Sequence, residues 1–181
     1  MTITMVESPR LLMPGMANFQ PGVERYRITG GAVTAFLLSA GDRLEIIDPE
    51  GCQPVEVAAF DRESHSDPGL LGESSGSPAT GIAAILASDE PDARRVADAL
   101  TVKGIDLGAT TAIHLFATDS PAGETTWLTA STDVVCVVGV PGVKMRPEDQ
   151  NPPTDIITFI HRTAPPPPGL QVLPAPLADQ N

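Results

Sequence analysis

The sequence predicts a mainly β fold, α+β at the margin, built as an antiparallel sandwich or partly open barrel of about eight strands with a small helical insertion. Short segments of alternating or β-branched apolar residues outnumber helical patterns. These segments fall in runs instead of alternating with helices, which argues against a parallel α/β fold. The 19 prolines indicate that much of the remaining chain is loop or linker.

The expected strands follow one another along the chain. The first two are Glu24–Ile28 and the apolar run 32–39, which is typical of a central strand buried on both faces. Strands at 44–47 and 55–60, joined by the turn Asp48-Pro49-Glu50-Gly51, are predicted to form a β-hairpin. Four further strands are expected, at 111–117, 125–129, 133–140 and 155–161.

Helical patterns are confined to residues 81–103. A short alanine-rich helix is expected at 81–87, and a second helix carries an apolar stripe at i, i+3, i+4 and i+7, namely Ala93, Val96, Ala97 and Leu100. Ser88 and Asp89 are the N-cap candidates of the second helix, and Gly104 is expected to end it. The polar stretches 61–80 and 141–153 are expected to be long loops, the first anchored by Leu70 and Leu71.

The chain divides by composition into an irregular N-terminal arm (1–22), one β-rich domain (23–162) and a Pro-rich tail or linker (163–181). Pro165–Pro168 predicts a semi-rigid polyproline II spacer. One interpretation of the tail is a disordered C-terminus. The preferred one is a linker to a further domain that this chain does not contain.

The charge balance limits the classes of partner. A net charge of −12, from 11 basic and 23 acidic side chains, argues against nucleic acid and against anionic membrane surfaces. The N-terminus lacks the pattern of a signal peptide, and no apolar run approaches the length of a membrane span. Two cysteines make no disulfide framework, so a reduced, cytoplasmic protein is expected.

Acidic side chains around the predicted hairpin are the best candidates for chemistry. Glu50 and Glu56 are the candidate catalytic pair, since neighbouring carboxylates can share a proton and act as acid and base. Asp48 and Gln53 are the candidate ligand-binding residues. The competing interpretation is a capped turn with solvated acids, in which Asp48 bonds the backbone of its own turn.

Metal binding has little support in the spacing of potential ligands. His65, His114 and His161 are scattered, and the two cysteines form no CxxC pair. Cys136 fits a small core residue. Cys52, in the turn, is a weak candidate ligand, so no metal or other cofactor is assigned to this chain.

The turn region nevertheless resembles a known motif. The segment "AGDRLEIIDPEGCQPVEVAAFD" is similar to the early motif of the urea carboxylase-associated family, and the matching residues are Gly41, Leu44, Ile46, Asp48, Glu50, Gly51, Gln53, Val55 and Phe60. Glu56 replaces the usual Asp of the family, and Cys52 replaces a frequent Asn. A second similarity spans the buried strand 133–140 and the closing strand, where Gly139-Val140-Pro141 stands in place of Ala-Cys-Pro. The missing cysteine implies the loss of a metal ligand.

The resemblance implies the N-terminal, non-catalytic structural module of an aminomethyltransferase-like enzyme of the trimethylamine N-oxide demethylase type, which releases dimethylamine and formaldehyde. Metal and tetrahydrofolate would then belong to the full-length relative, and the partner would be a downstream catalytic domain or a homo-oligomer. The alternative is a stand-alone hydrolase or deiminase of the carboxyguanidine deiminase type that uses Asp48, Glu50 and Glu56. A third possibility is an oligomerisation or partner-binding module.

Overall fold

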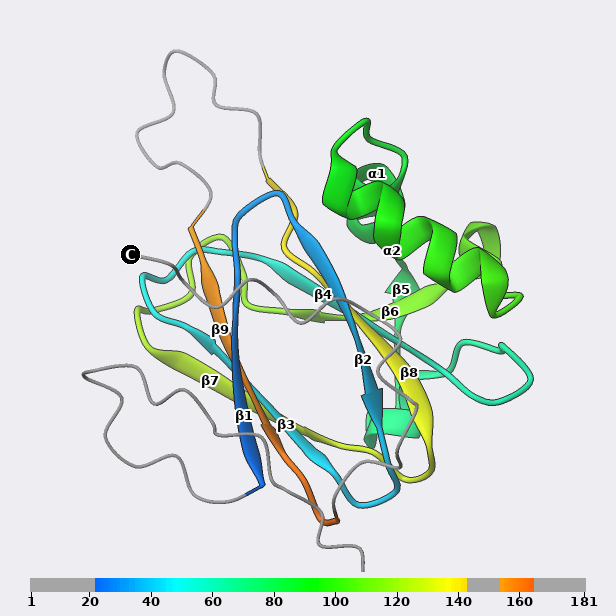
Figure 1. Cartoon of the computed structure of the whole chain (residues 1–181). Helices are drawn as coiled ribbons and strands as arrows, with labels where there is room; N and C mark the ends of the chain where they lie inside the picture. Colours follow the sequence, from blue (N-terminus) through cyan, green and yellow to red (C-terminus); the bar gives the residue numbers. More distant parts are fainter. Residues whose placement is uncertain (1–21, 143–153, 165–181) are drawn as a thin grey trace, which may run out of the picture.

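The computed structural model describes residues 22–142 and 154–164 of the chain, which form two packed antiparallel sheets (Figure 1). The four-stranded sheet has the order β1-β9-β3-β7, with bounds Val23–Ile28, Ile156–His161, Arg43–Asp48 and Glu124–Thr129. The five-stranded sheet has the order β2-β8-β4-β6-β5, with bounds Val33–Leu38, Val134–Gly139, Val55–Phe60, Thr111–Leu115 and Ser77–Pro78. The predicted mainly β sandwich is therefore confirmed, and the sheets do not close into a barrel.

Most connections between the described strands cross from one sheet to the other, and β5–β6 is the one consecutive pair among them that is hydrogen-bonded. β1, β3, β7 and β9 lie in one sheet, and β2, β4, β6 and β8 lie in the other. This is the pairing pattern of a double-sheet jelly roll. The predicted hairpin at residues 44–60 is therefore wrong, because β3 pairs with β7 and β9 while β4 pairs with β6 and β8.

The reason lies in the segment between β3 and β4, residues 49–54, which we call the corner. Two-residue connections are typical of tight hairpins, whereas the corner has six residues. Pro54, directly before β4, has no N–H to donate to a ladder. The corner thus carries the chain between the two sheets.

Apolar side chains fill two layers of core. The first lies between the sheets and includes Leu44, Ile46, Val57 and Ile160. The second lies between the five-stranded sheet and the helices α1 (Thr80–Leu86) and α2 (Pro91–Val102), where Phe60 packs with the helical side chains Ile82, Val96 and Leu100. The helices therefore cover one face of the five-stranded sheet (Figure 1).

Two details of the expected elements are corrected. The run 32–39 forms β2, which is buried on both faces but lies at the edge of its sheet, because the core and the helices cover its faces while only β8 pairs with it. The N-cap of α2 is Glu90, and neither Ser88 nor Asp89 caps the helix. Gly104, at φ +74°, follows the end of α2 as expected.

The loop 61–80 contains more order than its composition predicts. It includes a 3-10 helix, η1 (Pro68–Leu71), and Leu71 is buried as expected of an anchor. A second short 3-10 helix, η2 (Leu107–Ala109), precedes β6. The predictions for residues 1–21, 143–153 and 165–181 lie outside the described residues, and the proposed domain limits stay predictions.

An ion cluster of the buried Asp42 with the partly buried Glu24 and Arg162, which we call the buried ion cluster after Asp42, joins the two sheets at one end of the sandwich. The Arg162 guanidinium donates through Nε and Nη2 to the Glu24 carboxylate, at 3.0 and 2.9 Å, and through Nη1 to Asp42 at 2.9 Å. It also donates to the carbonyl oxygen of Leu37 in the five-stranded sheet. One arginine thus links the last strand of the four-stranded sheet to the edge of the other sheet.

Candidate functional site

Asp48 organises the corner from the last position of β3. Its carboxylate is fully buried, and Oδ1 accepts the N–H of Gly51 at 2.9 Å. Oδ2 accepts the N–H of Gln53 at 2.9 Å and the hydroxyl of Ser120 at 3.2 Å. Both oxygens are thereby engaged by the protein itself, as the capped-turn interpretation expects.

Gly51 and Cys52 give the corner its sharp bend. Gly51 has φ +83°, and a Cβ there would lie 2.7 Å from the carbonyl oxygen of Ser120 and 2.8 Å from the nitrogen of Ala122. Cys52 has φ +64°, in the left-handed region where Asn is enriched, which fits the frequent Asn of the resembled motif. The side chain of Cys52 is exposed, and its N–H donates to Ser120.

Gln53 links the corner to the residues that follow β8 and to those that precede β9. Its side chain is buried, its Nε2 donates to the carbonyl oxygen of Pro141 at 3.0 Å, and its Oε1 accepts the N–H of Thr154 at 2.9 Å. The two segments that resemble the family motifs therefore meet in space. Val140, at the position of the family's cysteine, is fully buried in the core between the sheets.

Glu56 faces the beginning of α1. Its buried carboxylate accepts the N–H groups of Gly81 and Ile82, both at 2.8 Å. Gly81 is required there, because a Cβ would lie 2.8 Å from Glu56 Oε1 and 2.5 Å from the Pro141 ring. His114 Nδ1 lies 3.9 Å from Glu56 Oε1. The carboxylate thus holds α1 against β4, directly after the corner.

The predicted catalytic pair has two very different environments. Glu50 is exposed on the corner and forms no hydrogen bond or ion pair within the described part of the chain. Glu56 is 5% exposed and already accepts two hydrogen bonds. The structure therefore does not bring them together as two carboxyl groups in one buried site.

The residues present do not fit a metal ion of the kind that the resemblance implies. Within residues 22–142 and 154–164, no group of three or more His, Cys, Asp or Glu side chains could hold one. Cys52 is exposed at the corner, whereas Cys136 is fully buried on β8 of the five-stranded sheet, where burial raises the pKa of its thiol to about 12. We therefore derive no chemical step through a metal.

Sequence reasoning missed the residues that form hydrogen bonds with Asp48, Gln53 and Glu56. These partners come from four separate segments of the chain and are Ser120, Pro141, Thr154 and Gly81. None of these residue types is distinctive alone, and only the sheet topology brings them together. The glycine at position 81, in an otherwise good helix-forming stretch, is the one local signal of a close approach.

Glu56→Gln is expected to lower the free energy of unfolding by about 1–3 kcal/mol. The amide has only one oxygen to accept the N–H groups of Gly81 and Ile82, and its NH₂ group would face the N–H that is left without an acceptor. Chemical denaturation of the full chain measures the effect. Glu50→Gln, an exposed change at the same corner, is the matched control and should stay within about 0.5 kcal/mol. Equal stabilities for both variants would contradict the capping role.

The chain is 34% identical over 169 residues to a trimethylamine-oxide aldolase from Ruegeria pomeroyi, which makes it homologous to part of that enzyme. The match covers 93% of this chain and 21% of the aldolase, so the chain spans about a fifth of the length of this curated relative. A DUF1989 family protein from Silicibacter pomeroyi has a similar fold, with 14% identity and a TM-score of 0.43 over 87% of this chain and 84% of that one.

A scan of protein-family models finds no match to the chain. Among the described residues, no helix has both the length and the apolar character needed to cross a membrane.

Proposed function

We propose that this chain is a structural, non-catalytic module of an aminomethyltransferase-like enzyme of the trimethylamine N-oxide demethylase type. The observation that carries the proposal is that the carboxylates on either side of the corner are already occupied by hydrogen bonds within the chain. The carboxylates of Asp48 and Glu56 are buried and bonded to main-chain N–H groups. Groups engaged in this way hold the fold together and leave no free acid–base pair there.

The relationship to a segment of trimethylamine-oxide aldolase supports the choice of enzyme type. In this proposal the substrate is trimethylamine N-oxide, the products are dimethylamine and formaldehyde, and the enzyme works in the cytoplasm. The metal and tetrahydrofolate belong to a catalytic portion outside these 181 residues, against which the module packs. The module contributes shape and stability to that enzyme.

The experiment has two arms. In the first, the purified chain is incubated with trimethylamine N-oxide, formaldehyde is measured, and metal content is determined by elemental analysis. We expect no turnover and no stoichiometric metal. In the second, this chain replaces the matching segment of the Ruegeria pomeroyi aldolase, and the chimera should fold and release formaldehyde. Turnover by the chain alone, or a chimera that folds without activity while the parent enzyme works, would overturn the proposal.

The alternative, a stand-alone hydrolase or deiminase that uses Glu50 and Glu56, makes the opposite prediction for Glu56→Gln. That variant would then lose turnover of an amidine or carboxylated amine at unchanged stability. Only the approach of His114 to Glu56 favours it in the described structure, because a nearby imidazole could exchange protons with the carboxylate.

A further inference from the structure

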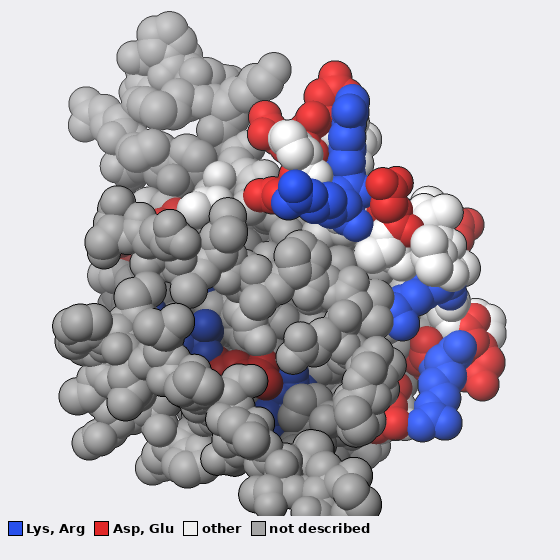
Figure 2. All heavy atoms as spheres, in the orientation of Figure 1, with Lys and Arg blue, Asp and Glu red and all other residues white. Residues whose placement is uncertain are grey.

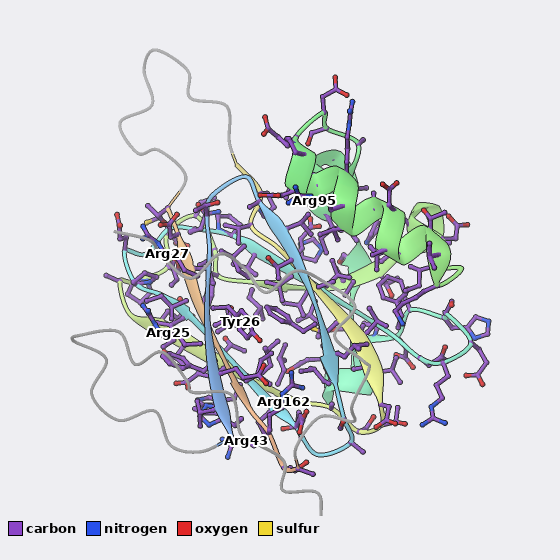
Figure 3. The ribbon with its side chains drawn as sticks, in the orientation of Figure 1. Arg25, Tyr26, Arg27, Arg43, Arg95 and Arg162 are labelled. Carbon is purple, nitrogen blue, oxygen red and sulfur yellow. The ribbon has the colours of Figure 1, made fainter. Side chains whose placement is uncertain are left out.

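The outer face of the four-stranded sheet is the surface that the described fold leaves uncovered. The helices cover the five-stranded sheet, and the other face of the four-stranded sheet packs into the core. The strands alternate regularly, and the outward positions, which we call the open face, are Val23, Arg25, Arg27, Arg43, Glu45, Ile47, Thr125, Trp127, Thr129, Ile157, Phe159 and His161. Figure 3 shows Arg25 and Arg27 projecting away from the helices, whereas Tyr26 projects inward.

The open face has an aromatic and aliphatic character. Trp127, the only tryptophan, is 42% exposed. The guanidinium of Arg43 lies 4.3 Å from the centre of its ring, and the imidazole of His161 lies 4.9 Å from it. Phe159, Ile47 and Ile157 are partly exposed beside this group. An exposed indole in such a group is typical of a surface that binds another protein.

The charge of the open face differs from that of the rest of the chain. It has three arginines, with Glu45 on the face and Asp155 beside it, in a chain whose net charge is −12. Most other described basic side chains are paired with acids, as Arg62, Arg94 and Arg95 are. Figure 2 shows this mixture of both signs over the helices. Arg25 and Arg43 form no ion pair within the described residues.

The register makes the open face complementary to itself. Its middle row runs Arg25, Phe159, Glu45, Trp127 across the sheet, and the next row runs Arg27, Ile157, Ile47, Thr125. Consider two copies whose open faces are in contact and are related by a two-fold axis that runs parallel to the strands. Each row of one copy then lies against the same row of the other copy, read in the opposite direction. This arrangement sets Arg25 opposite Trp127 of the other copy and Ile157 opposite Ile47, so cation–π and aliphatic contacts form twice. Phe159 then faces Glu45, whose carboxylate is already bonded to His161 within its own chain.

We therefore infer that the open face binds a second copy of this chain in a two-fold, sheet-on-sheet dimer. This inference deepens the proposed structural role and rests on it, since it names the surface by which the module scaffolds assembly. Four strands of six residues offer a flat area of roughly 400 Å², about half of what each partner buries in a standard interface. The dimer is accordingly weak, with a dissociation constant on the order of 10–100 µM.

Sedimentation equilibrium of the full chain from about 1 µM to about 1 mM tests the inference. We expect reversible dimerisation that strengthens as salt screens the repulsion between two chains of net charge −12. Arg25→Glu and Trp127→Ser should each weaken it at least about tenfold. Arg94→Glu, the same charge change on an exposed helical arginine, is the control and should leave it unchanged.

A chain that stays monomeric throughout the range overturns the inference, and so does dimerisation that both variants leave intact. Weakening by salt would indicate a contact between this basic face and an acidic surface, and would also overturn it. Acrylamide quenching of Trp127 tests for another occupant: an indole that is shielded in the monomer would mean that a segment of the chain outside the described residues covers the face, and would overturn the inference. None of these results bears on turnover by the isolated chain, so this inference and the proposed function can fail separately.

Discussion

Arg162→Met is expected to lower the free energy of unfolding by about 3–5 kcal/mol, because it leaves the buried carboxylate of Asp42 and the partly buried carboxylate of Glu24 without their shared cation. The Arg162 side chain is 11% exposed and that of Asp42 is 1% exposed. The planar fork of the guanidinium is bound to both oxygens of Glu24 and to Asp42 at the same time. Lysine carries the charge without this geometry, so Arg162→Lys should give an intermediate loss. Urea denaturation measures both variants.

The matched control is Arg62→Met. Arg62 pairs with Asp133 at 2.7 Å, but both side chains are largely exposed, at 77% and 51%. Removal of such a pair should cost less than about 1 kcal/mol. If Arg62→Met and Arg162→Met destabilise the chain equally, the buried ion cluster does not have the role assigned here.

The pH dependence gives a second check on the same cluster. Burial raises the pKa of Asp42, but hydrogen bonds from the N–H groups of Thr163 and Ser39 and from Arg162 outweigh it and hold the pKa below its usual value. The resulting stabilisation is complete above the unfolded-state pKa of about 3.9 and is lost as the pH falls through the lower folded-state pKa. The stability difference between the wild type and Asp42→Asn should therefore shrink below about pH 4. A constant difference would contradict this.

The alternation of side chains made the strands predictable, whereas strand pairing was not predictable from the same signal. β1, β7 and β9 begin and end within one residue of the expected positions. The alternation places a side chain on one of two faces, but it does not say which other strand lies beside it. In this topology most of the connections between described strands cross between the sheets, so a local turn pattern such as Asp48-Pro49-Glu50-Gly51 indicates a bend and leaves the pairing open.

The candidate site shows the same limit. The sequence marks Asp48, Gln53 and Glu56 as unusual polar residues next to strands, and all three are buried. Whether such a residue binds a ligand or the backbone depends on its neighbours. The N–H groups that bind Glu56 come from residues 81 and 82, and the groups that bind Gln53 come from residues 141 and 154. The bonded residues are separated by 25 or more positions in the sequence, so a local sequence pattern cannot predict that they meet.

Asp48→Ala is expected to lower the free energy of unfolding by about 3–4 kcal/mol, because it leaves the donors of Gly51, Gln53 and Ser120 without an acceptor. Two of these donors are main-chain N–H groups, those of Gly51 and Gln53, and Asp48 is the acceptor of both. Asp48→Asn keeps one acceptor oxygen and should lose about half as much. Thermal and urea unfolding of the full chain measure the series.

Glu50→Ala, two residues further along the chain and inside the corner, is the control for Asp48→Ala. Its side chain is exposed, so the change should stay within about 0.5 kcal/mol. A large loss for Asp48→Ala beside a small one for Glu50→Ala would mean that the acidic corner is a structural joint between two sheets. Similar small losses for both would mean that the bend forms without its carboxylate. Asp48 would then be free to bind a ligand, and the non-catalytic interpretation of this module would lose its main support.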